Sequence, residues 1–189
     1  MRVAFVIYDR MTLLDFAGVY DPVTRLRTMG FVPDLAYDIC ARTEQVRSAE
    51  GAELHAGVVA GDLSAYDLVI IPGGDGIRDL MKDPVFLRWI AVASATTTVA
   101  SVCGGSLLLG AAGMLRTRRA TTHPGLMDVL PQFAREVSRE RIVDDGTIIT
   151  AGGVTAAIDL GLYLCEKIAG REVREKIAQQ MDYRTCAIV

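Results

Sequence analysis

The stretch Val99-Ala-Ser-Val-Cys-Gly-Gly-Ser-Leu-Leu-Leu-Gly110 decides how the rest of the chain is interpreted. Its apolar run predicts a buried strand, its glycine pair a sharp turn, and its leucines a helix that packs on a core. A strand, a tight turn and a helix within so few residues form the layout of a nucleophile elbow, which needs small residues because the backbone reverses sharply. The stretch therefore predicts an α/β fold in which Cys103 projects from the turn.

Strand-like and helix-like segments alternate along the whole chain. Short β-branched runs bounded by turns are expected to form strands at residues 2–8, 34–41, 68–71, 98–102, 119–121 and 147–151. Residues 45–48 and 53–55 flank a glutamate-glycine turn and predict a hairpin added at the sheet edge. The alternation indicates a three-layer sandwich, in which a mostly parallel sheet carries helices on both faces.

Helical patterns are expected at residues 21–29, 84–95, 105–112, 125–130, 155–168 and 171–180. Asp21 is expected to cap the first of these helices, and Pro22 to occupy its first turn. Gly30 and Gly170 are expected to end helices, because glycine readily adopts left-handed geometry. No internal repeat or long linker divides the sequence, so we expect residues 1–189 to form a single domain.

The composition narrows the classes of partner. The chain has 189 residues, 51% of them apolar, and a net charge of only -3, with its basic residues scattered. A nucleic-acid binder needs a basic stripe, so nucleic acid is not an expected partner. The apolar runs fall well short of the roughly 20 residues that span a bilayer, and the N-terminus lacks the features of a secretory signal. We therefore expect a cytoplasmic protein that acts on small molecules.

Four cysteines, at positions 40, 103, 165 and 186, are too far apart for the C-x-x-C spacing of metal sites and redox pairs. Free thiols are therefore expected, and no metal. Cys40 and Cys165 lie in core-like apolar patterns, and Cys186 lies in a tail without an evident role. Cys103 could likewise be a small buried apolar residue. The glycine pair after its strand favours a nucleophile instead, and the following helix N-terminus is expected to lower the pKa of its thiol.

Three further segments follow predicted strands, where an open parallel sheet binds its ligands. They are Leu14-Asp-Phe16, Pro72-Gly-Gly74 and Ala151-Gly-Gly153. Asp15 lies in Leu14-Asp-Phe16, and a carboxyl among apolar neighbours has a raised pKa and can carry protons. An exposed loop aspartate or a helix cap is the alternative for Asp15. The backbone N–H groups of Gly74 and Gly104 are a natural pair of donors for an anion formed on the substrate. The segment Pro72-Gly-Gly74 could equally be an ordinary tight turn.

The two histidines are not equally good candidates for a partner of Cys103. His55 lies in the expected hairpin and is a poor candidate, whereas His123 could approach Cys103 from the next strand or could be structural. Gly73, His123 and Gly152 are possible pocket residues. Neither a G-x-G-x-x-G fingerprint nor a phosphate-binding P-loop is present, so no cofactor is expected.

These segments together resemble the ThiJ/PfpI superfamily, and most closely its isocyanide hydratase branch. The resemblance is carried by Leu14-Asp-Phe-Ala-Gly18, Ile71-Pro-Gly-Gly-Asp-Gly76, Ser101-Val-Cys-Gly-Gly-Ser-Leu-Leu-Leu-Gly-Ala-Ala-Gly113, Arg119-Ala-Thr-Thr-His123 and Thr150-Ala-Gly-Gly-Val-Thr-Ala-Ala-Ile-Asp159. It implies a flavodoxin-like fold and a homodimer with the active site near the subunit interface. Two positions depart from that branch, namely Gly104 in place of threonine and Pro124 in place of tryptophan.

In the hydratase branch, the cysteine that matches Cys103 attacks the isocyanide carbon and the acid that matches Asp15 handles protons. A thioimidate forms, and water then releases an N-substituted formamide without a cofactor. A cofactor-free cysteine hydratase or lyase acting on a small electrophile is therefore the leading hypothesis.

Other functions stay open. A glyoxalase-type or deglycase-type enzyme would use the same thiol on the aldehyde carbon of a 2-oxoaldehyde. The protease-like branch is disfavoured, because it places histidine where this chain has Gly104. A non-catalytic redox-sensing or ligand-sensing domain, related to the N-terminal domain of AraC-type regulators, is the remaining alternative. Only 19 residues follow Gly170, which is too few for the DNA-binding module of such regulators.

Overall fold

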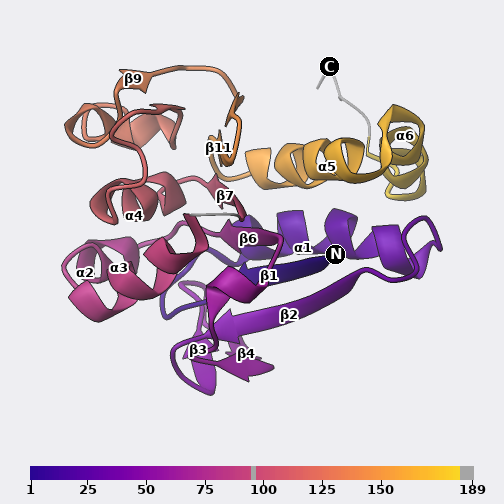
Figure 1. Ribbon diagram of the computed structural model, residues 1–189, viewed down its shortest axis with the longest axis horizontal. Helices are drawn as coiled ribbons and strands as arrows, with labels where there is room; N and C mark the ends of the chain where they lie inside the picture. The colour runs from indigo at the N-terminus through magenta and orange to yellow at the C-terminus, as the bar shows by residue number, and fades with distance from the viewer. Residues whose placement is uncertain (95–96, 184–189) are drawn as a thin grey trace.

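The structure is a computed structural model that describes residues 1–94 and 97–183, and its centre is a seven-stranded sheet (Figure 1). The strand order is β10-β11-β7-β6-β1-β2-β5. All neighbouring pairs are parallel except β10 and β11. The strand bounds are β1 (Arg2–Val6), β2 (Ala36–Ala41), β5 (Val58–Val59), β6 (Leu68–Ile71), β7 (Thr98–Val102), β10 (Ile142–Asp145) and β11 (Ile148–Ala151).

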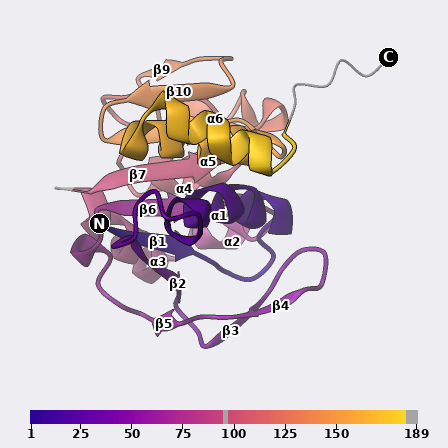
Figure 2. The same ribbon diagram turned by 90° about the vertical axis from the view of Figure 1, so that its right-hand side faces the viewer.

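Helices cover both faces of this sheet, as the sequence predicts. Helices α1 (Leu13–Thr28), α5 (Ala156–Ala169) and α6 (Arg171–Gln180) pack together on one face. Helices α2 (Ile77–Leu80), α3 (Pro84–Ala91) and α4 (Gly105–Ala111) pack together on the other face, behind the sheet in Figure 2. The central strands are buried on both faces, which explains why β6 is apolar at every position. The fold is thus the expected mostly parallel three-layer sandwich.

The strand order indicates where in the sheet a ligand would bind. The order β2-β1-β6-β7-β11 reverses its direction between β1 and β6, which is the topological switch point of a flavodoxin-like sheet. The chain therefore leaves the carboxyl ends of these neighbouring strands in opposite directions and opens a crevice between them. The segments that follow β1, β6 and β7 meet at this crevice.

Several predicted elements are confirmed within a few residues. The strands at 68–71 and 98–102 and the helix at 171–180 are observed with those bounds, and the strands at 2–8, 34–41 and 147–151 are observed in shortened form. The helices at 105–112 and 155–168 shift by one residue, and the one at 84–95 becomes α3 followed by a 3-10 turn over Val92–Ser94, with Ala95 outside the described residues. Gly30 and Gly170 have φ of +78° and +89°, as expected at helix ends.

The predicted start of the first helix is wrong. Helix α1 begins at Leu13 rather than at residue 21, so Pro22 lies inside the helix and Asp21 does not cap it. Its buried apolar positions, Phe16, Val19, Val23 and Leu26, follow helical spacing straight across the proline. Packing against α5 is so close at this point that a Cβ on Gly161 would lie 2.3 Å from Pro22 Cγ. Burial of one continuous face therefore outweighs the cost of proline within the helix.

Two predicted elements in the middle of the chain are also wrong. The strand at 119–121 is only β8 (Arg119–Ala120), which pairs with β9 (Glu136–Val137) outside the main sheet. Thr121 instead donates its backbone N–H to the side-chain oxygen of Thr150. The helix at 125–130 is replaced by 3-10 turns over Pro124–Leu126 and Leu130–Gln132, since Gly125 disfavours a helix and Pro131, which lacks an N–H, blocks its continuation.

The predicted hairpin exists, but it does not extend the main sheet. Strands β3 (Gln45–Arg47) and β4 (Glu53–His55) form a sheet of their own, and the edge beside β2 is taken by β5, which the sequence analysis missed. Backbone hydrogen bonds from Arg10 N–H to Arg47 and from Ala49 N–H to Met11 hold the hairpin against the segment that follows β1. Strand β10 was also missed, although Asp145-Gly146 is a strong hairpin signal between β10 and β11.

Among the described residues, no helix is long and apolar enough to cross a membrane.

Candidate active site

Cys103 lies at the turn between β7 and α4, with a left-handed φ of +55° that a residue other than glycine rarely adopts. Its N–H donates to the carbonyls of Ala151 and Gly152, both at 3.0 Å. Its own carbonyl accepts hydrogen bonds from the hydroxyls of Ser106 and Thr122. These bonds over-determine the strained conformation, so the predicted nucleophile-elbow geometry is present.

Asp15 meets Cys103 from the other side of the switch point. It lies in the first turn of α1, is 0% exposed, and accepts a hydrogen bond of 3.0 Å from the N–H of Gly73 through Oδ2. Its Oδ1 is buried without a hydrogen-bond partner among the described residues. A Cβ on Gly73 would lie 2.9 Å from both Asp15 Oδ2 and Cys103 Cβ. Glycine at position 73 is therefore what lets the carboxyl and the cysteine approach each other.

The electrostatics of this pair differ in part from the prediction. Burial, opposed by the Gly73 hydrogen bond, raises the pKa of Asp15 to about 7, as expected for a carboxyl among apolar neighbours. Burial and the charge of Asp15 raise the pKa of the Cys103 thiol to about 12, although a hydrogen bond from Gly104 N–H acts in the opposite direction. The prediction that Cys103 ionises more easily than a free cysteine is thus wrong for the resting site. Between these two pKa values the pair holds one proton and one negative charge.

The other predicted donors and pocket residues lie close to the pair. The N–H of Gly104 faces the sulfur, whereas the N–H of Gly73 is already engaged by Asp15. Gly74, with φ of +120°, lines the same pocket, and a Cβ on it would lie 2.3 Å from the backbone nitrogen of Thr12. The pairing of Gly74 and Gly104 as anion donors stays a prediction.

His123 and the glycines after β11 complete the surroundings of the sulfur. The Nδ1 of His123 accepts a hydrogen bond of 3.0 Å from Gly125 N–H, so the neutral ring carries its proton on Nε2 and offers a donor there. A Cβ on Gly153 would lie 2.8 Å from Cys103 Sγ and 2.9 Å from His123 Cδ2. Gly152, in contrast, has ordinary contacts and touches Cys103 only through its carbonyl. The sequence analysis chose Gly152, whereas the closest approach to the sulfur is made by its neighbour Gly153.

A pocket of about 660 Å³ opens above Cys103. Its wall is mainly apolar and includes Ile77, Leu107, Leu126, Val129 and Val154. Asp75 and Arg78 stand at its exposed edge, and their side chains are 4.0 Å apart. The pocket therefore suits a small, largely apolar molecule that carries one reactive group.

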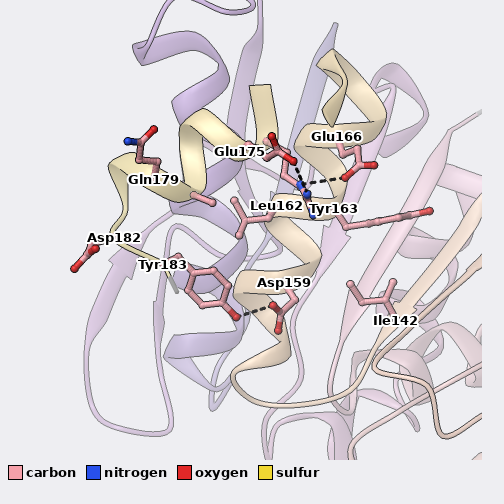
Figure 3. A pocket seen from close by; sticks show the side chains of 11 residues that line it. Ile142, Asp159, Leu162, Tyr163, Glu166, Glu175, Gln179, Asp182 and Tyr183 are labelled. Atoms are coloured by element: carbon pink, nitrogen blue, oxygen red, sulfur yellow. Dashed lines mark hydrogen bonds and ion pairs between the residues drawn. The ribbon is translucent and has the colours of Figure 1, made fainter. Parts of the chain in front are cut away.

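A second pocket, of about 690 Å³, lies between α5, α6 and β10 (Figure 3). Glu166 and Glu175 both form ion pairs with Arg174, and Tyr183 donates a hydrogen bond to Asp159, which Figure 3 marks with a dashed line. No cysteine or histidine is among the described residues that line it. The chemistry therefore points to the pocket above Cys103, although the two pockets are similar in size.

The amino-acid sequence matches the DJ-1/PfpI family over residues 1–167. The chain belongs to the DJ-1/PfpI family. It is 34% identical over 185 residues to the isonitrile hydratase of Pseudomonas putida, in an alignment that covers 97% of this chain and 78% of that relative. It is 27% identical over 133 residues to a glutathione-independent glyoxalase of Caenorhabditis elegans, which covers 69% of this chain and 71% of that relative.

Solved structures agree with this assignment. The crystal structure of a ThiJ/PfpI family protein from Pseudomonas syringae superposes with a TM-score of 0.89 at 28% identity, covering 100% of this chain and 77% of that chain. The resemblance that the motifs indicate and the flavodoxin-like fold of a DJ-1/PfpI protein are thereby confirmed.

The other described cysteines and histidine of this DJ-1/PfpI protein lie away from the pocket. Cys40 and Cys165 are both 0% exposed, and Cys165 donates to the carbonyl of Pro22, in keeping with core positions. His55 is on β4 and does not line the pocket, and Cys186 lies outside the described residues. No group of three potential metal-ligating side chains occurs in the part of the chain that the structure describes.

Sequence reasoning missed Tyr8, which supports the site from below. Its buried hydroxyl donates to the carbonyl of Pro72 at 2.6 Å. Burial and the nearby charges of Asp15 and Cys103 raise the pKa of Tyr8 well above its usual value, so it stays a donor. Tyr8 therefore holds the turn that presents Gly73 N–H to Asp15. Its position at the end of the first predicted strand was the only available signal.

The raised pKa of Asp15 has a consequence for stability. The folded protein favours the protonated carboxyl, so the contribution of Asp15 is fully present below its ordinary pKa of 3.8 and is lost as the pH rises through about 7. A shift of this size corresponds to roughly 4 kcal/mol of destabilisation above pH 7. An Asp15→Asn variant is neutral and keeps an oxygen for Gly73 N–H. We expect its free energy of unfolding, relative to wild type, to rise by about 2 to 4 kcal/mol between pH 5 and pH 8.

Chemical denaturation of both proteins at the two pH values measures this difference. Subtracting the wild-type value at each pH removes the contributions of all other carboxylates. A difference that is the same at pH 5 and pH 8 would contradict the account of a buried, reluctantly charged Asp15.

Proposed function

We propose that this chain is a cofactor-free hydratase that adds water to the terminal carbon of an isocyanide and releases an N-substituted formamide. Cys103 is the nucleophile in this proposal and Asp15 is the proton carrier. The observation that carries it is the buried pair itself, a strained thiol beside a carboxyl with pKa near 7 and one unpaired oxygen, at the floor of a largely apolar pocket. The isonitrile hydratase of P. putida is a relative over nearly the whole chain, which supports the choice of substrate.

The first step is addition of the thiol across the isocyanide carbon. Above pH 7 the pair carries one charge, so the Asp15 carboxylate accepts the proton of Cys103 as Sγ attacks. The proton then passes from Asp15 to the same carbon. The product is a thioimidate, in which the carbon holds one hydrogen, the sulfur and a double bond to nitrogen. No thiolate needs to accumulate beforehand, which fits the raised pKa of Cys103.

The second step is hydrolysis of the thioimidate. Asp15 accepts one proton from water as the water oxygen bonds to the carbon and passes it to the nitrogen, so the carbon then holds a hydroxyl, the sulfur and an NH group. As the carbon–sulfur bond breaks, Asp15 moves the remaining hydroxyl proton to the leaving sulfur, which restores the Cys103 thiol, and the formamide departs. In this proposal, negative charge in this step is stabilised by Gly104 N–H, which faces the sulfur, and by the Nε2 proton of His123, which lines the same pocket.

This mechanism predicts a simple pH dependence. Below about pH 7 Asp15 is protonated and cannot accept the proton of Cys103, so kcat/KM should fall about tenfold for each unit of pH. Above about pH 7 kcat/KM should be level. The Asp15→Asn variant should show a much lower kcat/KM without this rise, since its amide cannot accept a proton. A wild-type profile that is flat from pH 5 to pH 8 would exclude Asp15 as the titrating base.

Product analysis in labelled water tests the proposed function. The protein is incubated with n-butyl isocyanide in water enriched in heavy oxygen, and the product is examined by mass spectrometry. We expect one heavy oxygen in the formamide, and an acid quench during turnover should show a thioimidate adduct on the peptide that contains Cys103. Absence of both formamide and adduct would contradict hydratase function.

A second candidate is conversion of a 2-oxoaldehyde. The named glyoxalase relative favours it, and the same thiol and carboxyl could form a thiohemiacetal and move a proton between adjacent carbons. Incubation with methylglyoxal provides the comparison. Turnover of methylglyoxal alone would replace the hydratase proposal, and reaction with neither compound would favour a sensing role for the domain.

A further inference from the structure

The space in front of Gly104 is occupied by two side chains. A Cβ on this glycine would lie 2.5 Å from Ile77 Cδ1 and 3.2 Å from Leu126 Cδ1. Its backbone, with φ of -67° and ψ of -6°, is open to any residue, so glycine is not required by conformation. Gly104 directly follows the nucleophile, and its N–H faces the sulfur. Ile77 and Leu126 therefore form the part of the pocket wall that covers Gly104, the residue next to the nucleophile.

These two residues reach the site from separate segments. Ile77 is the first residue of α2, which follows the turn after β6, and only 6% of it is exposed. Leu126 ends the 3-10 turn that begins just after His123, and it is half-buried. Both line the pocket that contains Cys103. Because isoleucine is β-branched and this one is closely packed, its side chain has little freedom to move away from an incoming molecule.

The chemistry of an isocyanide means that an apolar wall beside the nucleophile can determine which substrates react. Its organic substituent offers the protein no hydrogen-bonding group beside the reactive carbon, so shape and apolar contact must distinguish one substituent from another. One methylene group in a close-fitting pocket changes kcat/KM by about 10-fold to 200-fold. The whole pocket has a volume of about 660 Å³, so a larger part of the substituent can be accommodated farther from the sulfur.

We propose that Ile77 and Leu126 determine which isocyanides reach Cys103, by admitting substituents that are unbranched next to the nitrogen and excluding those that are branched there. This inference rests on the proposed hydratase function. It assigns the two side chains to substrate selection and leaves the proton transfers to Asp15 and Cys103.

The test compares n-butyl with tert-butyl isocyanide, two isomers whose four carbons form a linear chain in the first and branch directly beside the nitrogen in the second. An Ile77→Val variant removes the Cδ1 methyl that approaches Gly104, and core positions tolerate this change well. We expect the ratio of kcat/KM for tert-butyl over n-butyl isocyanide to rise about tenfold in Ile77→Val, and by at least as much in Leu126→Ala. Leu80→Ala is the matched control, since Leu80 is on the same helix but lines a different pocket, and its ratio should stay at the wild-type value.

Alkylation of Cys103 gives a second readout that does not need hydratase activity. Iodoacetamide and its α-methyl homologue differ by one branch beside the reacting carbon, and mass spectrometry of the peptide that contains Cys103 measures each rate. Ile77→Val and Leu126→Ala should raise the relative rate of the branched reagent, whereas Leu80→Ala should not.

The two readouts separate the two possible failures. If wild type hydrates n-butyl isocyanide but neither ratio changes in the variants, the assignment of Ile77 and Leu126 is overturned and the hydratase proposal survives. If the alkylation ratio rises as expected but no isocyanide is hydrated, the wall is supported as a selector of unbranched electrophiles and the hydratase proposal fails.

Discussion

A Cys103→Ala variant is expected to lose isocyanide hydration by at least about 1,000-fold in kcat, because no other described group can form the covalent intermediate. The thiol is the only cysteine side chain among the described residues that lines the pocket. Water and Asp15 would remain, yet direct attack of water on the isocyanide carbon lacks the strong nucleophile and the positioning that the sulfur supplies. Steady-state rates with n-butyl isocyanide measure the loss.

The matched control is Cys165→Ala, which removes another buried thiol. Burial raises the pKa of Cys165 to about 12, as it does for Cys103, but Cys165 lies in α5 and contacts α1 through the carbonyl of Pro22. This variant should lower the melting temperature through the cavity it leaves and keep its turnover. Substantial activity in folded Cys103→Ala, or an equal loss in Cys165→Ala, would be incompatible with a nucleophile at position 103.

The sequence could reveal the elbow because its cause is local. A turn that reverses within two residues requires small neighbours, and Gly105 shows why, since a Cβ there would lie 2.5 Å from the carbonyl oxygen of Ile71. Asp15 could be chosen for a similar reason, because a lone acid within an apolar run is visible without coordinates. The grouping of both at one crevice follows from the rule that ligands bind at the carboxyl ends of parallel strands.

The ionisation of Cys103 could not be predicted in the same way. The helix N-terminus beside it is local and favours the thiolate, but the opposing effects come from segments far away in sequence. Asp15 approaches from α1, and the walls that exclude water come from α2 and from the turn after His123. Desolvation and a neighbouring negative charge then outweigh a short helix of seven residues. The predicted start of α1 is wrong for a related reason, since contacts with α5 override the local signal of Pro22.

The prediction with the next largest effect concerns Gly153. A Gly153→Ala variant should lose about 100-fold or more in kcat/KM, because its methyl group would lie 2.8 Å from Cys103 Sγ and 2.9 Å from His123 Cδ2. Contacts this short force the sulfur or the imidazole to move. The backbone bonds from Cys103 N–H to Ala151 and Gly152 leave the main chain little room to adjust, so the side chain of Cys103 must turn. A displaced sulfur is poorly placed for proton transfer to Asp15.

Gly152→Ala separates this effect from a general intolerance of the loop after β11. A Cβ on Gly152 would have its nearest neighbours at 3.7 and 3.9 Å, which are ordinary contacts, and the carbonyl that receives Cys103 N–H is kept. We expect less than about a threefold change in kcat/KM for this variant, the size usual for a substitution that makes only ordinary contacts. Iodoacetamide alkylation of Cys103 should slow in Gly153→Ala and not in Gly152→Ala. Equal losses of kcat/KM in the two variants would contradict this account. The methyl group added at position 152 does not touch Cys103, so activity would then be limited by the loop after β11 and not by contact with the sulfur.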